Sequence, residues 1–127
     1  LNGCFARTFI FLLLLLSALR NRMLRMNPEL IKFIEWLLRK NIHFSVTSAF
    51  RTAEQNAACN GSKYSQHLTG DAVDLAPVDL PIGVFYSVVE SSPFEFDQLI
   101  RYRTFVHISF ARGRKPRQME LDFTDRK

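Results

Sequence analysis

Three residues of types that bind metal ions stand in two short segments of the sequence. His67 and Asp74 are seven positions apart, and His107 follows in a later segment. Zinc in hydrolases is usually held by three protein ligands drawn from His, Asp and Glu, which leaves a fourth position for water. Gly70 and Ala72 are small enough for the chain to turn back, so His67 and Asp74 could reach one ion.

Asp74 and His107 also have ordinary structural explanations. Asp74 lies within the apolar stretch 72–76, where a buried carboxylate needs a partner that a metal could supply. His107 lies between Val106 and Ile108, and taken alone it reads more readily as a core histidine held by hydrogen bonds. Composition and spacing therefore leave the metal site open.

A helix and a strand are expected before this segment. Asn27 can cap the first free N–H groups of a helix, and Pro28 fits its first turn. Five apolar residues then fall on one face at helical spacing: Leu30, Phe33, Ile34, Leu37 and Leu38. Alternating apolar and polar residues predict a strand over 42–50. Thr52 is positioned to cap a short helix over 53–59.

The remaining segments complete the expected fold class. Residues 62–70 read as a polar loop and 72–76 as a strand. Asp79 and Pro81 are expected to open a helix that runs through Val89. Further strands are expected over 96–102, 105–110 and 118–123. The mixture predicts an α+β domain with a small antiparallel sheet and flanking helices.

Length and charge restrict the classes of function. A chain of 127 residues suits one domain, and 47% hydrophobic with 23% charged residues is ordinary globular composition. The net charge of +5 indicates either an affinity for polyanions or simply a solvated surface. The arginines near the end come with no stacking-aromatic motif and no helix-turn-helix pattern, so we expect no nucleic-acid partner. We expect a monomer.

The beginning of the chain carries an apolar run at 9–19 that is flanked by arginines. The run is shorter than the roughly 20 residues of a membrane-spanning helix, and its cleavage site is poor for a signal peptide. Residues 1–25 are therefore a leader, a membrane-surface anchor or a non-native upstream segment, and 26–127 form the domain. Contact with a membrane is expected only if 9–19 is retained.

Several of these segments together resemble one family. The segments are S48-A49-F50-R51-T52, E54-Q55-N56, G61-S62-K63-Y64-S65-Q66-H67-L68-T69-G70-D71-A72-V73-D74-L75, F96-D97-Q98-L99-I100 and V106-H107-I108-S109-F110. In this order they resemble the M15 family of peptidoglycan peptidases, above all its short phage-type and D-Ala-D-Ala carboxypeptidase-like members. The resemblance covers about 26–110.

The resemblance implies a site and an activity. It places Zn²⁺ on His67, Asp74 and His107, on the face of a sheet with a hedgehog or DD-peptidase-like fold. It implies hydrolysis of peptidoglycan peptides, in the stem or the cross-link, by a DD-carboxypeptidase or an endopeptidase. Such an enzyme acts on the bacterial cell wall, whether it is exported or released by a phage.

The same resemblance suggests roles for two polar residues. It implies that Arg51 binds substrate and steadies the developing oxyanion, a role that suits a fixed guanidinium. Ser65, two positions before His67, is a candidate donor in the substrate pocket. The structural alternatives are that Arg51 pairs with Glu54 and that Ser65 caps the loop.

The general base is the part of the pattern that this sequence does not match. Many relatives carry an acidic residue shortly before the final histidine, whereas 101–106 contain none. We therefore select Asp97, although the register of the two strands decides whether it shares the face of His107. The missing acid also supports an alternative function, a non-catalytic zinc-stabilised domain that binds the cell wall.

Overall fold

The computed structural model describes residues 26–126 of the chain, and within them it forms an α+β fold. The helices and strands, in chain order, are α3 (Pro28–Arg39), β1 (Phe44–Ser48), α4 (Ala53–Ala58), β2 (Ala72–Pro77), α5 (Ile82–Glu90), β3 (Gln98–Arg101), β4 (Val106–Ser109) and β5 (Met119–Asp122). A short 3₁₀ helix, η1 (Gln66–Thr69), precedes β2. The predicted α+β class is confirmed.

The five described strands form one sheet in the order β1-β2-β4-β3-β5. The pairs β1–β2, β2–β4 and β3–β4 are antiparallel, but β5 runs parallel to β3. The sheet is therefore mixed, and the expectation of an antiparallel sheet holds for all but its last strand. The reason is the segment 110–118, which carries the chain from the end of β4 past the start of β3. A tight hairpin would have forced an antiparallel neighbour instead.

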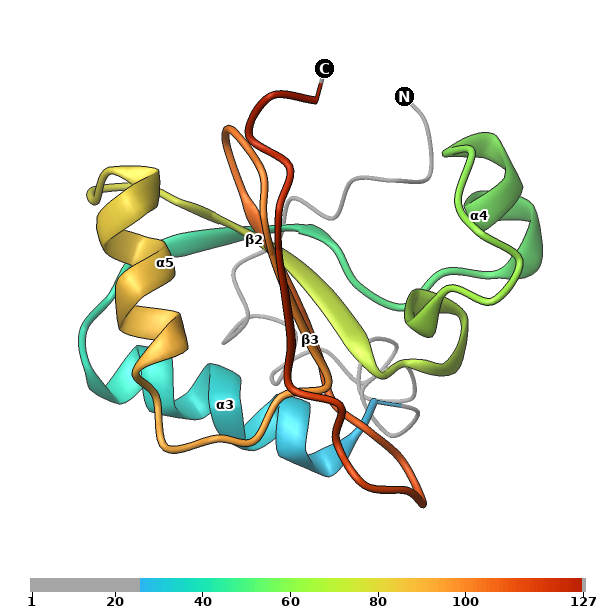
Figure 1. Cartoon of the computed structure of the whole chain (residues 1–127), viewed down its shortest axis with the longest axis horizontal. Coiled ribbons are helices and arrows are strands. Elements are labelled where there is room, and N and C mark those ends of the chain that lie inside the picture. Colours follow the sequence, from blue (N-terminus) through green and yellow to red (C-terminus); the bar gives the residue numbers. More distant parts are fainter. Residues whose placement is uncertain (1–25, 127) are drawn as a thin grey trace, which may run out of the picture.

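Helices α3 and α5 cover one face of the sheet, and α4 with η1 lies on the other side (Figure 1). The apolar core fills the space beneath α3 and α5. Its fully buried members include Leu30, Phe33, Leu37, Val73, Leu75, Phe85, Leu99 and Ile108. Leu38, expected on the buried face of the first helix, is 37% exposed, because the buried face of α3 ends at Leu37.

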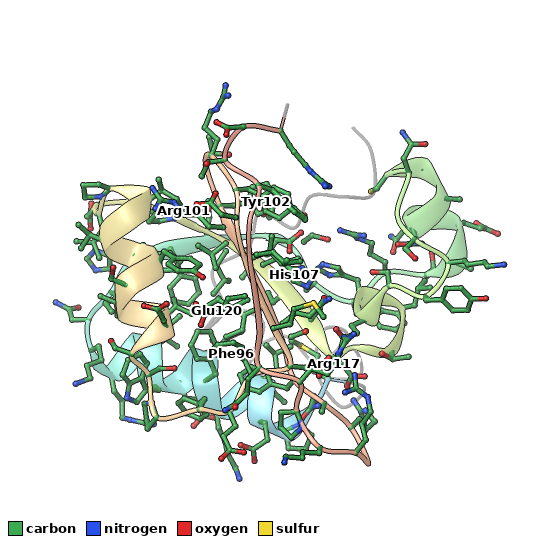
Figure 2. All side chains as sticks on the ribbon, viewed as in Figure 1. Phe96, Arg101, Tyr102, His107, Arg117 and Glu120 are labelled. Atoms are coloured by element: carbon green, nitrogen blue, oxygen red, sulfur yellow. The ribbon has the colours of Figure 1, made fainter. Side chains whose placement is uncertain are left out.

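The opposite face of the sheet carries the polar residues. Side chains alternate between the two faces of a strand, so Val73 and Leu75 enter the core while Asp74 points the other way. Figure 2 shows the same division for labelled side chains: Tyr102 and His107 lie toward α4, whereas Arg101 lies toward α5. The predicted metal ligands therefore lie on the sheet face that α4 and η1 border.

Local signals explain where the helices begin. The Asn27 side chain accepts a hydrogen bond from the Glu29 N–H and so caps α3. Thr52 and Gln55 form a reciprocal capping box at the start of α4. Both starts are as the sequence predicts. Within residues 26–126, no helix has the length and apolar character needed to cross a bilayer.

Candidate metal centre

Each of the three predicted ligands comes from a different element. His67 lies in η1, Asp74 in β2 and His107 in β4. The register of β2 and β4 places Asp74 directly opposite His107. Directly paired residues on neighbouring strands have Cβ atoms about 5 Å apart on the same face, so these two side chains must meet.

A tight turn brings His67 to the same place. The Ser65 hydroxyl accepts a hydrogen bond from the His67 N–H at 3.2 Å and caps η1. Gly70 ends η1 with φ of 76°, a left-handed conformation that glycine adopts without steric cost. The chain reverses there and enters β2, so that His67 faces Asp74, as expected from the small residues between them.

The three side chains converge closely. Asp74 Oδ1 lies 3.2 Å from His67 Nε2 and 2.9 Å from His107 Nδ1. One ligand atom from each residue lies within 4.8 Å of the others, close enough for a single ion. All three side chains are largely buried, with exposed fractions of 3% for His67, 10% for Asp74 and 12% for His107.

The hydrogen bonding of His67 fits a bound cation. Its Nδ1 lies 2.8 Å from the Ala49 carbonyl oxygen, which can only accept, so Nδ1 carries the proton. In a neutral imidazole Nε2 then holds a lone pair, and this lone pair faces the Asp74 carboxylate. Two acceptors at that distance repel each other unless positive charge lies beside them, and a metal ion supplies that charge. A second ring nitrogen fixed by a carbonyl is also the usual arrangement of zinc-bound histidines.

His107 gives a second indication that this site binds a metal ion. Its Nε2 is buried and has no hydrogen-bond partner within the described part of the chain. A buried polar atom without a partner is costly, and such atoms in a native site call for a missing group. His67, Asp74 and His107 together are therefore chemically suited to hold a metal, and two histidines with one carboxylate are a donor set that zinc accepts.

The Asp74 carboxylate is ionised in this setting. Burial raises its pKa, but in the absence of a metal ion the side chains of His107 and His67 can donate to it, and these contacts outweigh burial and hold the pKa well below its usual range. Arg51 Nη2 adds positive charge 3.5 Å from Asp74 Oδ2. An ionised carboxylate is the form that binds a metal ion.

Arg51 is held from two sides. Its Nε donates to Ser48 Oγ at 2.8 Å, and its Nη1 donates to Asn56 Oδ1 at 3.1 Å. The described polar contacts of the Arg51 side chain run to these residues and to Asp74, and Glu54 is not among them. A bulge between Val46 and Ser48 shifts the register so that Ser48 pairs with Asp74. The guanidinium is thus fixed at the edge of the predicted site.

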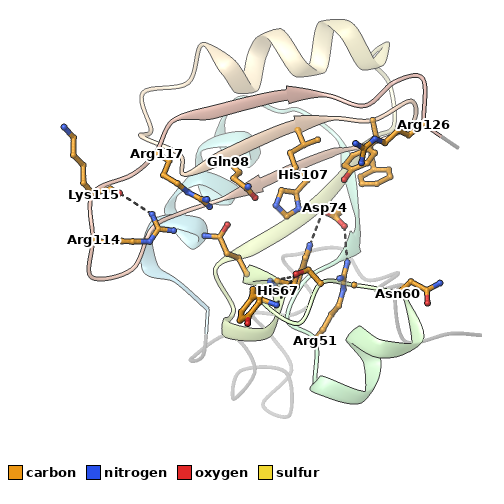
Figure 3. Close-up of a pocket in the computed structure, with 18 residues that line it drawn as sticks. Arg51, Asn60, His67, Asp74, Gln98, His107, Arg114, Lys115, Arg117 and Arg126 are labelled. Carbon is orange, nitrogen blue, oxygen red and sulfur yellow. Dashed lines mark hydrogen bonds and ion pairs between the residues drawn. The ribbon is translucent and has the colours of Figure 1, made fainter.

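An open pocket of about 1060 Å³ lies over the triad (Figure 3). Its lining includes the three candidate ligands, Arg51 and Ser65. Ser65 therefore both caps η1 and lines the pocket. Asp74 is the sole carboxylate among the described residues that line it.

Asp97, the candidate base, lies elsewhere. Strand β3 pairs with β4 so that Gln98 and Ile100, and not Asp97, share the face of His107. The Asp97 side chain is fully buried and receives hydrogen bonds from Arg114 and Arg117. These bonds, that of Arg114 foremost, hold its pKa far below the usual range, against the effect of burial. The catalytic role predicted for Asp97 gains no support from this placement.

The sequence interpretation missed several residues of the site. Asn56, which orients Arg51, stands in a segment that resembles the family, but the resemblance implies no role for it. Arg114, Lys115 and Arg117 line the pocket but read as part of a basic tail. The available signal was Gly113, which adopts φ of 69° and marks a turn that returns the chain to the sheet.

The comparisons with known proteins agree with this geometry. A family model described as Peptidase M15 matches residues 15–109. The match spans all three candidate ligands and the strands β1 to β4 of the sheet. No curated protein matches the chain significantly.

Proposed function

This chain belongs to the M15 peptidase family, and on that premise we propose that it is a zinc-dependent peptidase of bacterial peptidoglycan. The proposed substrates are peptide bonds of the stem or the cross-link, cut as by a DD-carboxypeptidase or an endopeptidase. The observation that carries the proposal is the convergence of His67, Asp74 and His107 at the floor of an open pocket.

The residues of the site have distinct proposed roles. His67, Asp74 and His107 would hold the zinc ion, which when bound supplies Lewis-acid chemistry and activates water near neutral pH. Arg51 presents a fixed guanidinium to the pocket and would hydrogen-bond the carbonyl oxygen of the scissile bond as negative charge develops there. Ser48 and Asn56 keep that guanidinium in place before substrate arrives.

A second candidate function follows from the shortage of acids in the pocket. A peptidase needs a group that accepts a proton from water, and Asp74 is the sole pocket carboxylate in residues 26–126. Asp74 is already committed to the two histidines. This observation favours a zinc-stabilised domain that binds cell-wall peptides without cutting them.

One experiment separates the two functions. Zinc content and the release of amino groups from purified peptidoglycan would be measured on the full chain. We expect one zinc per chain and measurable release, both lost in His67→Ala and His107→Ala. His43→Ala is the matched control, because His43 is an exposed histidine outside the pocket that pairs with Asp79.

The outcomes are distinct. Zinc bound without release of amino groups, across wall types and pH values, would favour the binding domain. Stoichiometric zinc in both site variants would overturn the assigned ligands. Mass spectrometry of the products distinguishes the two modes of cleavage, since a carboxypeptidase releases single amino acids and an endopeptidase releases peptides.

A further inference from the structure

The wall of the pocket that residues 110–118 form is strongly basic. The segment 110–118 between β4 and β5, here called the basic loop, contributes Arg114, Lys115 and Arg117 to the lining. Arg51 and Arg126 bring the described basic side chains of the pocket to five, against one carboxylate. Such an excess of one sign, in a cleft with low-dielectric walls, concentrates anions.

The basic loop is held in place by one buried carboxylate. Asp97 Oδ1 and Oδ2 accept from Arg114 Nη1 and Nη2 at 2.7 and 2.8 Å, a two-pronged contact. Asp97 also accepts from Arg117 Nη2 at 2.7 Å and from the Arg117 main-chain N–H at 2.9 Å. Gln66, the neighbour of His67, completes the arrangement by donating to Asp97 Oδ2 at 3.0 Å.

This arrangement leaves positive charge directed outward. Two guanidinium groups share a single carboxylate, so one positive charge is not neutralised. Both arginine side chains are 45% exposed, while the Asp97 side chain has no exposure. Within the described part of the chain, Arg117 Nη1 has no hydrogen-bond acceptor, and Lys115 adds a further charge at the same wall.

The basic loop and the metal centre belong to one pocket. Figure 3 shows Arg114, Lys115 and Arg117 at one side of the pocket and Arg126 at the other, with His107 and Asp74 between them. Gln98 lies between the basic loop and His107 on the same sheet face. A molecule that occupies the centre can therefore extend along the sheet to the basic loop.

We propose that the basic loop binds a carboxylate of the peptide substrate, away from the scissile bond, and makes the site selective for acidic peptides. The inference rests on the proposed function. An anion that shares a pocket with a peptide bond at the centre belongs to the same molecule, and the anions of a peptide are carboxylates. Fixed guanidinium groups match the planar carboxylate better than a lysine does.

Binding to the full chain, freed of metal by a chelator, tests this inference without reference to catalysis. Two tetrapeptides, acetylated at the N-terminus and amidated at the C-terminus, would be titrated by calorimetry. They are identical except for Glu against Gln at one position, and the titration is repeated with that position moved along the peptide. At one position we expect the Glu peptide to bind about tenfold more tightly, as a charge-assisted hydrogen bond implies. Arg117→Gln and Lys115→Gln should each reduce that preference.

Two controls keep the test decisive. Arg39→Gln removes the same charge from the exposed surface of α3, away from the pocket, and should preserve the preference. Lys115→Gln covers the case in which Arg117→Gln disturbs folding, because Lys115 makes no contact with Asp97 among the described hydrogen bonds. Unchanged unfolding temperature would show that either variant reports on binding.

The outcomes separate this inference from the proposed function. Equal binding of Glu and Gln peptides at every position would overturn the inference, even if the zinc-loaded protein cuts both. Inorganic phosphate would also be added as a competitor. If it displaces the Glu peptide and the Gln peptide equally, the basic loop binds anions without selecting the carboxylate, and the inference is overturned. A preference for Glu that disappears in Lys115→Gln supports the inference, even if no peptide is hydrolysed and the peptidase proposal fails.

Discussion

The guanidinium of Arg51 is the most constrained charged group beside the triad. Ser48, Asn56 and Asp74 contact it on three sides, and its side chain is 12% exposed. A donor fixed in this way needs no reorganisation when charge develops on a substrate oxygen, and this is the origin of most oxyanion stabilisation. Its position makes it the clearest test of catalysis at the scale of a single residue.

Arg51→Ala should leave the protein folded and zinc content unchanged while turnover falls about 100-fold or more, as for the loss of an oxyanion donor. Arg51→Lys should restore little, because an ammonium cannot reach Ser48, Asn56 and the substrate together. The measurement is kcat and KM on a soluble peptide, alongside metal content. Turnover equal to wild type in Arg51→Ala would exclude Arg51 from the reaction.

The helix α4 acts on the site through one buried side chain. Asn56 accepts from Arg51 and donates through Nδ2 to the Ser62 carbonyl at 2.8 Å, so it ties α4, Arg51 and the following loop together. Gly61 lies against this contact: a Cβ there would stand 2.1 Å from Asn56 Oδ1. The absence of a side chain at Gly61 is therefore a requirement of the Asn56–Arg51 contact.

Asn56→Ala should lower kcat/KM about tenfold, since Arg51 loses one hydrogen bond that fixes it. Zinc content should not change, because Asn56 touches none of the three ligands. Asn56→Asp, which keeps the acceptor toward Arg51, should recover part of the loss. A merely structural role would predict that Asn56→Asp is as harmful as Asn56→Ala.

The elements were predictable where their signals are local. Two helix starts are indicated by side chains a few positions apart: Asn27 with Pro28 for α3, and Thr52 with Gln55 for α4. The parallel pairing of β5 with β3 depends on the path of 110–118, which no local pattern encodes. The failure to foresee the place of Asp97 has the same origin, since a shift of one residue in register moves a side chain to the other face.

At the scale of the whole molecule, the stability of the fold depends on Asp97. Its main-chain carbonyl accepts from Met119 N at the start of β5, and its side chain holds Arg114 and Arg117. A buried carboxylate with a depressed pKa stabilises the folded state above its unfolded pKa of about 3.9. That contribution is lost as pH falls below this value toward the lower folded pKa.

Asp97→Asn should therefore destabilise the protein by about 3 kcal/mol near pH 7, as expected for breaking a buried ion pair. The difference from wild type should shrink as pH falls below about 4, where Asp97 takes up a proton in the unfolded wild-type chain while it stays ionised in the folded one. Urea unfolding of both proteins at a series of pH values measures this difference in the free energy of unfolding. A difference that stays constant between pH 7 and pH 3 would contradict the role of the charge.

The same variant addresses the general base. Loss of a base lowers turnover without affecting stability, whereas loss of the contacts described for Asp97 lowers stability. Unchanged turnover in folded Asp97→Asn would exclude Asp97 as the base.

The candidate ligands could be predicted as a set, and the surroundings of the pocket could not. His67, Asp74 and His107 stand in a recognisable pattern, and their convergence follows from a turn at Gly70 and one strand pairing. The basic loop gave no such pattern, because arginines on a tail look alike whether they face solvent or a pocket. Their place at the pocket depends on contacts with Asp97, which is about 20 residues away in the chain.

The origin of the ligands in three separate elements has a thermodynamic consequence. No local segment of an unfolded chain holds His67, Asp74 and His107 together, so zinc would bind the folded state almost alone. By mass action, free zinc at 1,000 times its dissociation constant would then add about 4 kcal/mol to the free energy of unfolding. The ion would act as a reversible cross-link between η1, β2 and β4, and the concentration of free zinc would set part of the free energy of unfolding.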